Sequence, residues 1–294
     1  MSETAAKREY PDGFRVITIG SGAPGVSLKR GNPATLVQYQ DKYFLVDCGY
    51  GACRTLVKNG IEIYDIRNIL ITHQHEDHNA DFMHLLLAGW YDAKNSRTEV
   101  NIVGPQTKLL YENTYKICED DIVGRIEVGS RQKAGINSDG ISTNVGIYDL
   151  TEDDVSLKLD GVAIDAHKIS HGNMQSYSYR FTADNKSVVV TGDVAYTDDL
   201  ADFYKGTDLL VVDAMTLTGF FSMFTEDMIE KAMGNTHMSQ RQIGKVLMDS
   251  GAKDVILTHI GGDFIDFDAS AAYFRSIGFE GEIYGAYDGM TVDL

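Results

Sequence analysis

The ends of the apolar segments constrain this chain more than any other feature. Apolar runs typical of β-strands, at residues 68–72 ("NILIT") and 254–258 ("DVILT"), lead directly into histidines, and another at 187–193 ("SVVVTGD") ends at an aspartate. The first run is followed by "HQHEDH" (73–78), which holds three histidines and an aspartate. Because catalytic and binding groups gather where strands end, we expect these polar residues to share one site.

Predicted strands and helices fill both halves of the chain. Strands are predicted at residues 14–20, 34–39, 43–47, 68–72, 99–104, 155–160, 161–169, 176–182, 187–193, 208–214 and 254–259. Helices are predicted at residues 51–60, 82–90, 105–117, 197–206, 239–251 and 270–278. This order predicts a sandwich of two α/β layers within a single domain covering residues 1–294.

An acidic segment separates the two halves. Between residues 119 and 160 there are ten acidic and four basic residues with little periodicity. We interpret residues 119–150 as an insertion that could act as a lid, since long loops in compact domains are often functional. A solvent-exposed acidic loop without a role in function explains the composition of this segment equally well.

The composition narrows the classes of partner. The net charge of −17 disfavours strong nucleic-acid binding, which depends on Lys and Arg neutralising phosphates. The N-terminus lacks an apolar signal region, and no apolar run is long enough to span a membrane, which favours a cytoplasmic protein without membrane attachment. The three cysteines show no C-x-x-C spacing, so we expect reduced, buried thiols rather than a thiolate metal site.

The "HQHEDH" stretch is typical of a metal site. In an extended segment His73, His75 and Asp77 lie on one side, and a turn can bring His78 to the same centre. Imidazole and carboxylate ligands suit zinc or a neighbouring first-row metal. Surface histidines in a polar loop are the alternative. The further candidates after strand ends, His171, Asp193 and His259, would complete the ligands that two metals need.

Five segments resemble the metallo-β-lactamase superfamily, and within it the ribonuclease Z branch and its arylsulfatase-like relatives. They are "TIGSGAPG", "FLVDCGYG", "ITHQHEDH", "ISHGNMQSYSYRF" and "TGDV". The stretch "NTHMSQRQIGKVLMDSGAKDVILTHIGGDF" (235–264) is similar to the part of ribonuclease Z in which a His motif opens a helix and a strand ends in Leu-Thr-His. The resemblance covers nearly the whole chain.

This resemblance implies a four-layer αββα fold with two mixed β-sheets and a dinuclear zinc site, with Mn²⁺ and Fe²⁺ as alternative metals. It implies that one metal is held by His73, His75 and His171, the other by Asp77, His78 and His259, with Asp193 bridging them. Asp47 is expected beneath the site, orienting a ligand. The predicted catalytic residues are Asp77, His237 and Asp213, with His237 as general acid and Asp213 orienting it. The alternative for His237 is that it only caps its helix, and the alternative for Asp213 is that it only ends a strand.

Two histidines are predicted to stand outside this site. His84 lies within an apolar helix and is expected to be structural. His167 precedes His171 by four residues, and His171 is preferred because "SYSYR" follows it as in the family.

The chain departs from ribonuclease Z in ways that bear on the substrate. The basic arm that grips tRNA in bacterial enzymes is missing between His171 and Asp193, and Val212–Met215 replaces the His-Glu-Ala-Thr segment. We therefore predict a hydrolase that uses a metal-bound hydroxide on small phosphodiesters or sulfate esters. The alternatives are a lactonase or β-lactamase-like acyl hydrolase, a ribonuclease Z-type tRNA endonuclease, and a non-catalytic metal-binding scaffold.

Residues 215–237, rich in Met and Phe, could line an apolar substrate pocket or simply pack together. A homodimer is a further expectation, drawn from the family.

Overall fold

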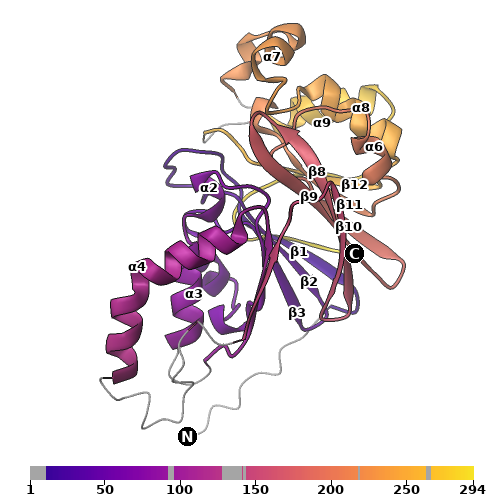
Figure 1. Cartoon of the computed structure of the whole chain (residues 1–294). Coiled ribbons are helices and arrows are strands. Elements are labelled where there is room, and N and C mark those ends of the chain that lie inside the picture. Colours follow the sequence, from indigo (N-terminus) through magenta and orange to yellow (C-terminus); the bar gives the residue numbers. More distant parts are fainter. Residues whose placement is uncertain (1–10, 92–95, 128–140, 142–143, 218, 263–265) are drawn as a thin grey trace, which may run out of the picture.

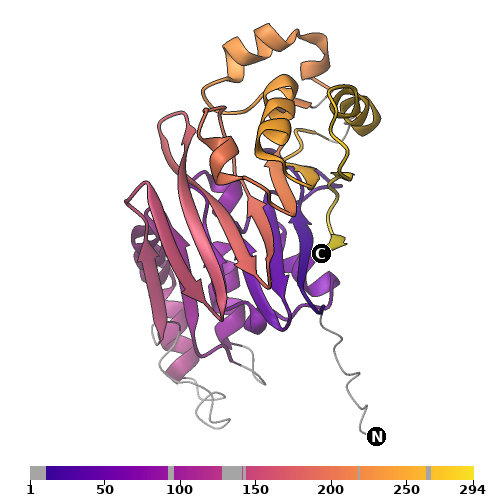
Figure 2. The same cartoon turned by 90° about the vertical axis from the view of Figure 1, so that its right-hand side faces the viewer.

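Two β-sheets packed face to face form the centre of the molecule, and helices cover their outer faces (Figures 1 and 2). The computed structural model describes residues 11–91, 96–127, 141, 144–217, 219–262 and 266–294. The predicted four-layer αββα architecture with two mixed sheets is confirmed. None of the described helices is both long and apolar enough to cross a membrane.

The first sheet comes mainly from the N-terminal half and has the strand order β14-β1-β2-β3-β4-β5-β6. Its strands from β14 to β3 pair antiparallel, whereas β3 to β6 run parallel. The strands are β1 (Phe14–Gly20), β2 (Ala34–Tyr39), β3 (Lys42–Val46), β4 (Asn68–Leu70), β5 (Val100–Gly104), β6 (Val145–Asp149) and β14 (Met290–Asp293).

The second sheet comes from the C-terminal half and has the order β13-β12-β11-β10-β9-β8-β7. It is also mixed, with antiparallel pairing from β7 to β10 and parallel pairing from β10 to β13. The strands are β7 (Asp154–Leu159), β8 (Val162–His171), β9 (Met174–Ala183), β10 (Lys186–Val190), β11 (Leu209–Asp213), β12 (Asp254–Thr258) and β13 (Ile283–Gly285).

Helices flank both sheets. Short α-helices and 3₁₀ turns (η) supplement the long ones. On the side of the first sheet they are α1 (Ala52–Lys58), η1 (Ile63–Asp65), α2 (Glu76–Asn79), α3 (Phe82–Tyr91) and α4 (Thr107–Glu127). On the side of the second they are α6 (Leu200–Phe203), η3 (Met215–Leu217), η4 (Phe221–Met223), α7 (Glu226–Met233), α8 (Gln240–Ser250) and α9 (Phe267–Ser276).

Three apolar clusters hold these layers together. The central one lies between the sheets, where Phe44 of β3 meets Phe181 of β9 with ring centroids 5.6 Å apart. The other two pack the helices onto the outer face of each sheet. Strand β11 is buried along its whole length, as expected for a parallel strand covered on both faces. The two sheets are therefore fixed against each other, and their strand ends meet at one edge.

Several elements differ from the prediction. The edge strands β6, β13 and β14 are not predicted, because runs of only three to five residues give too few positions to establish a strand pattern. Helix α4 continues to Glu127 since Cys118 and Ile122 bury one side of it, and Arg125 pairs with Asp121 one turn away. Helix α6 is limited to four residues within the predicted 197–206.

The predicted insertion, residues 119–150, falls partly on described structure. Its first part forms the last turns of α4, which extend away from α2 (Figure 1), and its end forms β6. Residues 128–140 and 142–143 lie outside the described residues. The role of this segment as a lid stays a prediction.

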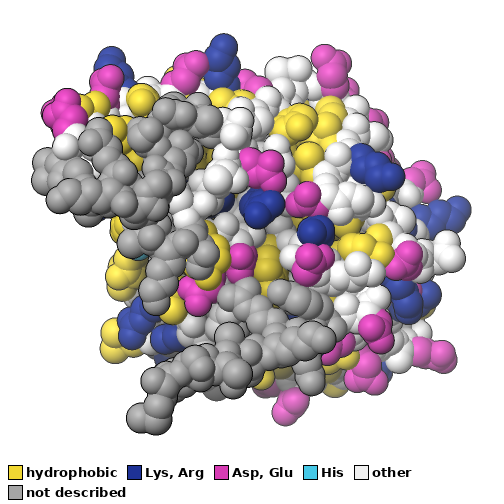
Figure 3. Space-filling model, turned by 90° about the horizontal axis from the view of Figure 1, so that it is seen from below, with side chains coloured by type: hydrophobic (Ala, Val, Ile, Leu, Met, Phe, Trp, Pro, Cys, Tyr) yellow, Lys and Arg dark blue, Asp and Glu magenta, His cyan; other side chains and the backbone are white. Residues whose placement is uncertain are grey.

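Charged side chains of both signs lie on the face of the molecule shown in Figure 3. Figure 3 shows the face at the opposite end of the molecule from α7, where acidic and basic side chains are interspersed with apolar ones.

Candidate metal centre

The "HQHEDH" stretch follows β4 and turns into α2. His75 has an extended backbone, with φ −68° and ψ 147°, and the single helical turn of α2 starts at the next residue. This change from strand to helix brings Asp77 and His78 back beside His73, and all three are buried. The turn that the sequence required for His78 is thus α2.

A buried carboxylate supports this stretch from below. Asp47 follows β3 and accepts hydrogen bonds from the Thr72 backbone N–H (2.8 Å), the Thr72 hydroxyl (2.8 Å) and His78 Nδ1 (2.7 Å). The Thr72 hydroxyl, having donated to Asp47, accepts from His73 Nδ1 at 3.0 Å. With both Nδ1 atoms protonated, the Nε2 atoms of His73 and His78 are left as free electron-pair donors. Asp47 therefore lies beneath the candidate site and orients the His78 ring, whereas the role of His78 as a metal ligand stays a prediction.

The first donor group, called group A here, consists of His73, His75, His171 and Asp193. His75 Nδ1 lies 2.9 Å from His73 Nε2 and 3.3 Å from His171 Nε2. Asp193 Oδ2 lies 3.8 Å from the Nε2 atoms of His73 and His171. His171 Nδ1 donates to the Thr236 carbonyl at 2.8 Å, so its Nε2 also faces the group.

The second donor group, called group B here, consists of Asp77, His78 and His259, with the other oxygen of Asp193 beside it. His259 Nε2 lies 3.5 Å from Asp77 Oδ2 and 3.2 Å from Asp193 Oδ1. His78 Nε2 lies 3.6 Å and 3.4 Å from the same two oxygens. Asp193 thus presents one oxygen to each group, the position predicted for a bridging ligand.

The backbone is specialised where these donors attach. His259 has φ 58° and Asp47 has φ 59°, both in the left-handed region that non-glycine residues rarely occupy. Gly192, just before Asp193, has φ 65°, and a Cβ there would lie 2.8 Å from the Cβ of Thr72. Glycine therefore lets the loop after β10 approach the loop after β4, which brings Asp193 to both groups.

Burial and charge set the protonation of His73 and Asp193. Burial, reinforced by the neighbouring His78, lowers the pKa of His73 far below its ordinary value, so its imidazole is neutral. Burial alone would raise the pKa of Asp193, but the attraction of His259 and His78 outweighs it and holds that pKa well below the usual range. A neutral imidazole and an ionised carboxylate are the forms that bind metals.

The donor set fits cations. Asp77 Oδ2, His78 Nε2, Asp193 Oδ1 and His259 Nε2 are buried without a hydrogen-bond partner among the described residues, although they converge on one point. Leaving several buried polar atoms unsatisfied is costly, and a cation between them would satisfy all four. At zinc–nitrogen distances of about 2.0–2.1 Å, two tetrahedral ligand nitrogens lie about 3.4 Å apart, close to the spacing of these atoms. The assignment of each residue as a ligand stays a prediction.

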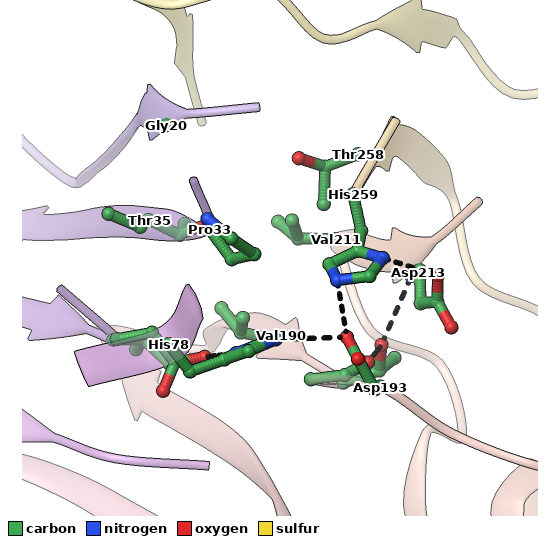
Figure 4. Close-up of a pocket in the computed structure, with 15 residues that line it drawn as sticks. Gly20, Pro33, Thr35, His78, Val190, Asp193, Val211, Asp213, Thr258 and His259 are labelled. Carbon is green, nitrogen blue, oxygen red and sulfur yellow. Dashed lines mark hydrogen bonds and ion pairs between the residues drawn. The ribbon is translucent and has the colours of Figure 1, made fainter. Parts of the chain in front are cut away.

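A histidine–aspartate pair adjoins both groups. His237 Nδ1 donates to Asp213 Oδ2 at 2.6 Å. Asp213 Oδ1 in turn lies 3.3 Å from His259 Nδ1, and Figure 4 shows these two side chains facing each other. The His237 ring lies 5.2 Å from that of His171 and 5.7 Å from that of His259, measured between ring centroids. The structure therefore places Asp213 in contact with His237, whereas the general-acid role of His237 and the orienting role of Asp213 stay predictions.

The ionisation of this pair is coupled. Burial opposes protonation of His237, yet the Asp213 carboxylate raises the pKa of His237 above its ordinary value. Burial likewise opposes ionisation of Asp213, and the attraction of His237 lowers its pKa to about 2. The pair is thus an ionised carboxylate that stabilises a protonated imidazole.

A small cavity lies below these residues, between the ends of the two sheets. Figure 4 shows His78 on one side and His259 on the other, with dashed lines joining both to Asp193 and with Val190 and Val211 lying between the two histidines. The site therefore lies on the seam between the sheets, with each sheet contributing one side.

The two histidines predicted to stand outside the site do so. The His84 side chain is exposed on α3 and lines an outer groove with α1. His167 lies on the same face of β8 as His171, but four residues of strand, about 13 Å, separate them. It contacts Asp154 at 2.7 Å and Asp199 at 3.2 Å instead.

Sequence reasoning missed the Thr236 carbonyl, which orients His171, and the Thr72 hydroxyl, which links Asp47 to His73. A backbone carbonyl has no sequence signature. Thr72 could have been found, since it stands directly before the motif at the end of a predicted strand.

The architecture is shared with solved structures of low sequence identity. The metallo-β-lactamase fold protein YhfI from Bacillus subtilis superposes with a TM-score of 0.73 at 22% identity, covering 96% of this chain and all of that one. The short form of human tRNase Z superposes with a TM-score of 0.70 at 18% identity, covering 95% and 98%. In sequence, ribonuclease Z of Mycobacterium bovis (strain BCG / Pasteur 1173P2) is 26% identical over 249 residues, covering 84% of this chain and 85% of that protein.

The fold and the two donor groups define the class of this protein: it is a metal-dependent hydrolase of the metallo-β-lactamase fold. Within that class, residues 14–227 match the model of the family described as anti-Pycsar protein Apyc1, and the chain belongs to that family. The predicted superfamily and the likeness to ribonuclease Z are confirmed, whereas the narrower family was not predicted.

Proposed function

We propose that this protein hydrolyses small phosphodiesters at a dinuclear, zinc-type centre formed by groups A and B. The observation that carries the proposal is the His237–Asp213 pair directly beside both donor groups. A phosphodiester needs charge neutralised on its oxygens and a proton supplied to its leaving alkoxide, and the two parts of the site supply these separately.

Group A would hold one cation and group B the other, with Asp193 between them. Two bound divalent cations lower the pKa of a shared water and neutralise negative charge on the attacked phosphoryl group. The protein's own contribution to this chemistry is to fix the donors, through Asp47 and Thr72 on one side and the Thr236 carbonyl on the other.

His237 would supply the proton for the leaving group. Its Nδ1 is occupied by Asp213, which leaves Nε2 as the atom that can donate to a substrate. The Asp213 carboxylate raises the pKa of His237 and so favours the protonated ring that carries the required proton. Asp213 is in turn held by the Met215 backbone N–H at 2.9 Å.

A small substrate is favoured over tRNA. The segment between His171 and Asp193 is a tight hairpin, in which Asp184 and Asn185 alone connect β9 to β10. Both residues have positive φ, as in a two-residue type I′ turn. There is no basic arm in these described residues, and the net charge of −17 also opposes a polyanionic substrate.

The first experiment is metal analysis of the purified protein, followed by turnover of a substrate panel. The panel contains bis(p-nitrophenyl) phosphate, 3′,5′-cyclic mononucleotides, p-nitrophenyl sulfate, a lactone, a β-lactam and a precursor tRNA. We expect about two metals per chain and cleavage of the phosphodiesters. Efficient cleavage of the tRNA or of the acyl substrates alone would overturn the proposal, and sulfate ester cleavage would support the second substrate class that the sequence predicts beside phosphodiesters.

The second experiment tests the proton donor by varying the leaving group. His237→Ala should slow cleavage of a cyclic nucleotide, whose leaving group is an alkoxide, by about 10²- to 10⁴-fold. It should affect bis(p-nitrophenyl) phosphate far less, because nitrophenolate departs without a proton. His84→Ala is the matched control and should leave both rates unchanged, and equal losses on both substrates would contradict the assignment of His237.

A further inference from the structure

The helix α7 is held on the molecule mainly by polar contacts to α8. It projects from the end of the second sheet, above α8 and α9 (Figure 1), and Ile229 is its one buried residue. Phe220 and Met223, in the η4 turn region before it, and Met228 within it are largely exposed. Apolar packing therefore contributes little to the position of α7.

An ionic cluster joins the two helices. Glu230 of α7 accepts hydrogen bonds from Arg241 of α8 through both carboxylate oxygens, from Nε at 3.0 Å and from Nη2 at 2.7 Å. The Ser239 hydroxyl, at the N-cap of α8, donates to the same carboxylate at 2.8 Å. Asp227 accepts from Arg241 Nη2 at 2.7 Å, and Glu226 accepts from the Arg241 backbone N–H at 2.8 Å.

The short turn between these helices carries two groups of the metal centre. Residues 234–238 connect the end of α7 to the N-cap of α8 and include His237 and Thr236. The backbone N–H groups of both residues donate to the Met233 carbonyl at 2.8 Å, so the turn continues directly from α7. The Thr236 carbonyl holds His171, and the Gly172 N–H donates to the Asn235 carbonyl at 2.6 Å.

We propose that Glu230, clamped by Arg241 and Ser239, is a positioning residue that fixes the turn 234–238 and thereby sets His237 and His171 in their working geometry. It touches neither substrate nor donor atoms. Its carboxylate joins the helix that leads into the turn to the helix that leaves it, so the turn has both of its ends fixed. The catalytic part of this inference rests on the proposed function, whereas the geometric part does not.

The chemistry of the cluster suits this role. A bidentate arginine–carboxylate pair is directional as well as attractive, because the planar guanidinium matches the two carboxylate oxygens. The hydrogen bond from Arg241, more than any other contact, lowers the pKa of Glu230, so the carboxylate stays ionised through the neutral range. Lysine at position 241 would keep the charge but lose the paired geometry.

The test compares Glu230→Ala and Arg241→Ala with a matched control, Arg15→Ala. Arg15 makes an equally bidentate pair with Asp293, at 2.6 and 3.0 Å, on strands of the other sheet. We expect kcat on a cyclic nucleotide to fall about 10- to 100-fold in the α7–α8 variants, as expected for a misplaced catalytic group, with KM changed less than threefold. Arg15→Ala should lower the melting temperature to a similar degree and leave kcat unchanged, and Glu230→Gln should restore part of the loss, since its amide oxygen still accepts from Ser239.

Two further measurements separate positioning from general destabilisation. In a His237→Ala background, Glu230→Ala should lower kcat by no more than about twofold, because residues that act through one another are not additive. In the metal-free protein, imidazole ¹⁵N–¹H spectra should show the His237 and His171 signals shifted by Glu230→Ala and the His84 signal unmoved.

The spectra remain decisive even if no phosphodiester is cleaved by the wild type. Unmoved His237 and His171 signals, or a loss of kcat that is equal in the presence and absence of His237, would overturn the proposal.

Discussion

The two sheets contribute to the metal centre in different ways. The first sheet supplies His73, His75, Asp77 and His78 from one continuous segment after β4, and side chains hold them, with Asp47 and Thr72 beneath. The second sheet supplies His171, Asp193 and His259 from three separate strand ends, and a backbone carbonyl orients His171. One half of the centre is therefore encoded locally, and the other depends on the packing of the whole second layer.

Asp193 is the residue in which the two halves meet, and removing it should have the largest effect. Asp193→Asn replaces the oxygen that faces one of the two donor groups with an amide and removes the charge. We expect turnover to fall more than about 10³-fold, beyond the loss of a single transition-state donor. Metal content, measured by elemental analysis, should drop below two per chain, and full metal content with normal turnover would contradict a bridging role.

Metal removal should loosen the second half of the centre more than the first. Ligands that bind only the folded state stabilise it, and two cations at about 100 times their dissociation constants would raise the melting temperature by roughly 5–15 °C. A chelator should reverse this shift. Hydrogen exchange should then increase after β8, β10 and β12 more than in α2. Equal protection of both regions would show that the donors of the two sheets depend on the metals to the same degree.

The side-chain support of the first sheet can be weakened without touching a donor. Thr72→Val keeps the shape of the residue but removes the hydroxyl that joins Asp47 to His73. Changes of this kind lower metal affinity about 10- to 100-fold, which competition with a chelating dye would measure. Thr114→Val, at a buried threonine on α4, serves as the control. The second sheet offers no equivalent change at Thr236, since the group that contacts His171 belongs to the backbone.

The smallest effect is expected at the end of the second sheet remote from the centre. Burial opposes ionisation of Asp208, but hydrogen bonds from Lys253 at 2.7 Å and from the Ser187 N–H at 2.8 Å lower its pKa. The pKa of Asp208 in the folded protein lies below its unfolded value of about 3.9. The stabilisation from this carboxylate is therefore fully present above about pH 3.9 and is lost as the pH falls through the folded pKa.

Asp208→Asn should therefore lower the free energy of unfolding at pH 7 by about 1 kcal/mol, since the lysine is exposed and its charge screened. The difference from wild type, measured by urea unfolding, should shrink below pH 4, and metal affinity should not change. If the difference in unfolding free energy between wild type and Asp208→Asn grew on acidification, the pKa of Asp208 would not be lowered by folding.

The contrast between the sheets also explains how much the sequence predicts. The donors of the first sheet stand within six positions of one another, from His73 to His78, and their spacing alone indicates a metal site. The donors of the second sheet are individually ordinary residues, and only their places at strand ends and their order in a known family single them out.

The long strands of the fold are predicted nearly to their ends because their apolar character is strong. The edge strands β6, β13 and β14 are not, since each is only three to five residues long and is defined by its pairing with a single neighbouring strand. The contacts around Glu230 are also invisible in the sequence, because pairs between acidic residues and arginine on facing helices have no fixed spacing. The residues of the site can therefore be predicted from the sequence, whereas the contacts that support them cannot.

The turn at Asp184 and Asn185 has a consequence for engineering. It lies at the tip of the β9–β10 hairpin, at the end of the second sheet away from the donors, and its strands remain in register up to the pair of Ala183 with Lys186. Exposed turn tips of this kind tolerate insertions well. A tethering tag or a small reporter domain placed between these two residues should fold with the protein and leave the mouth of the centre open.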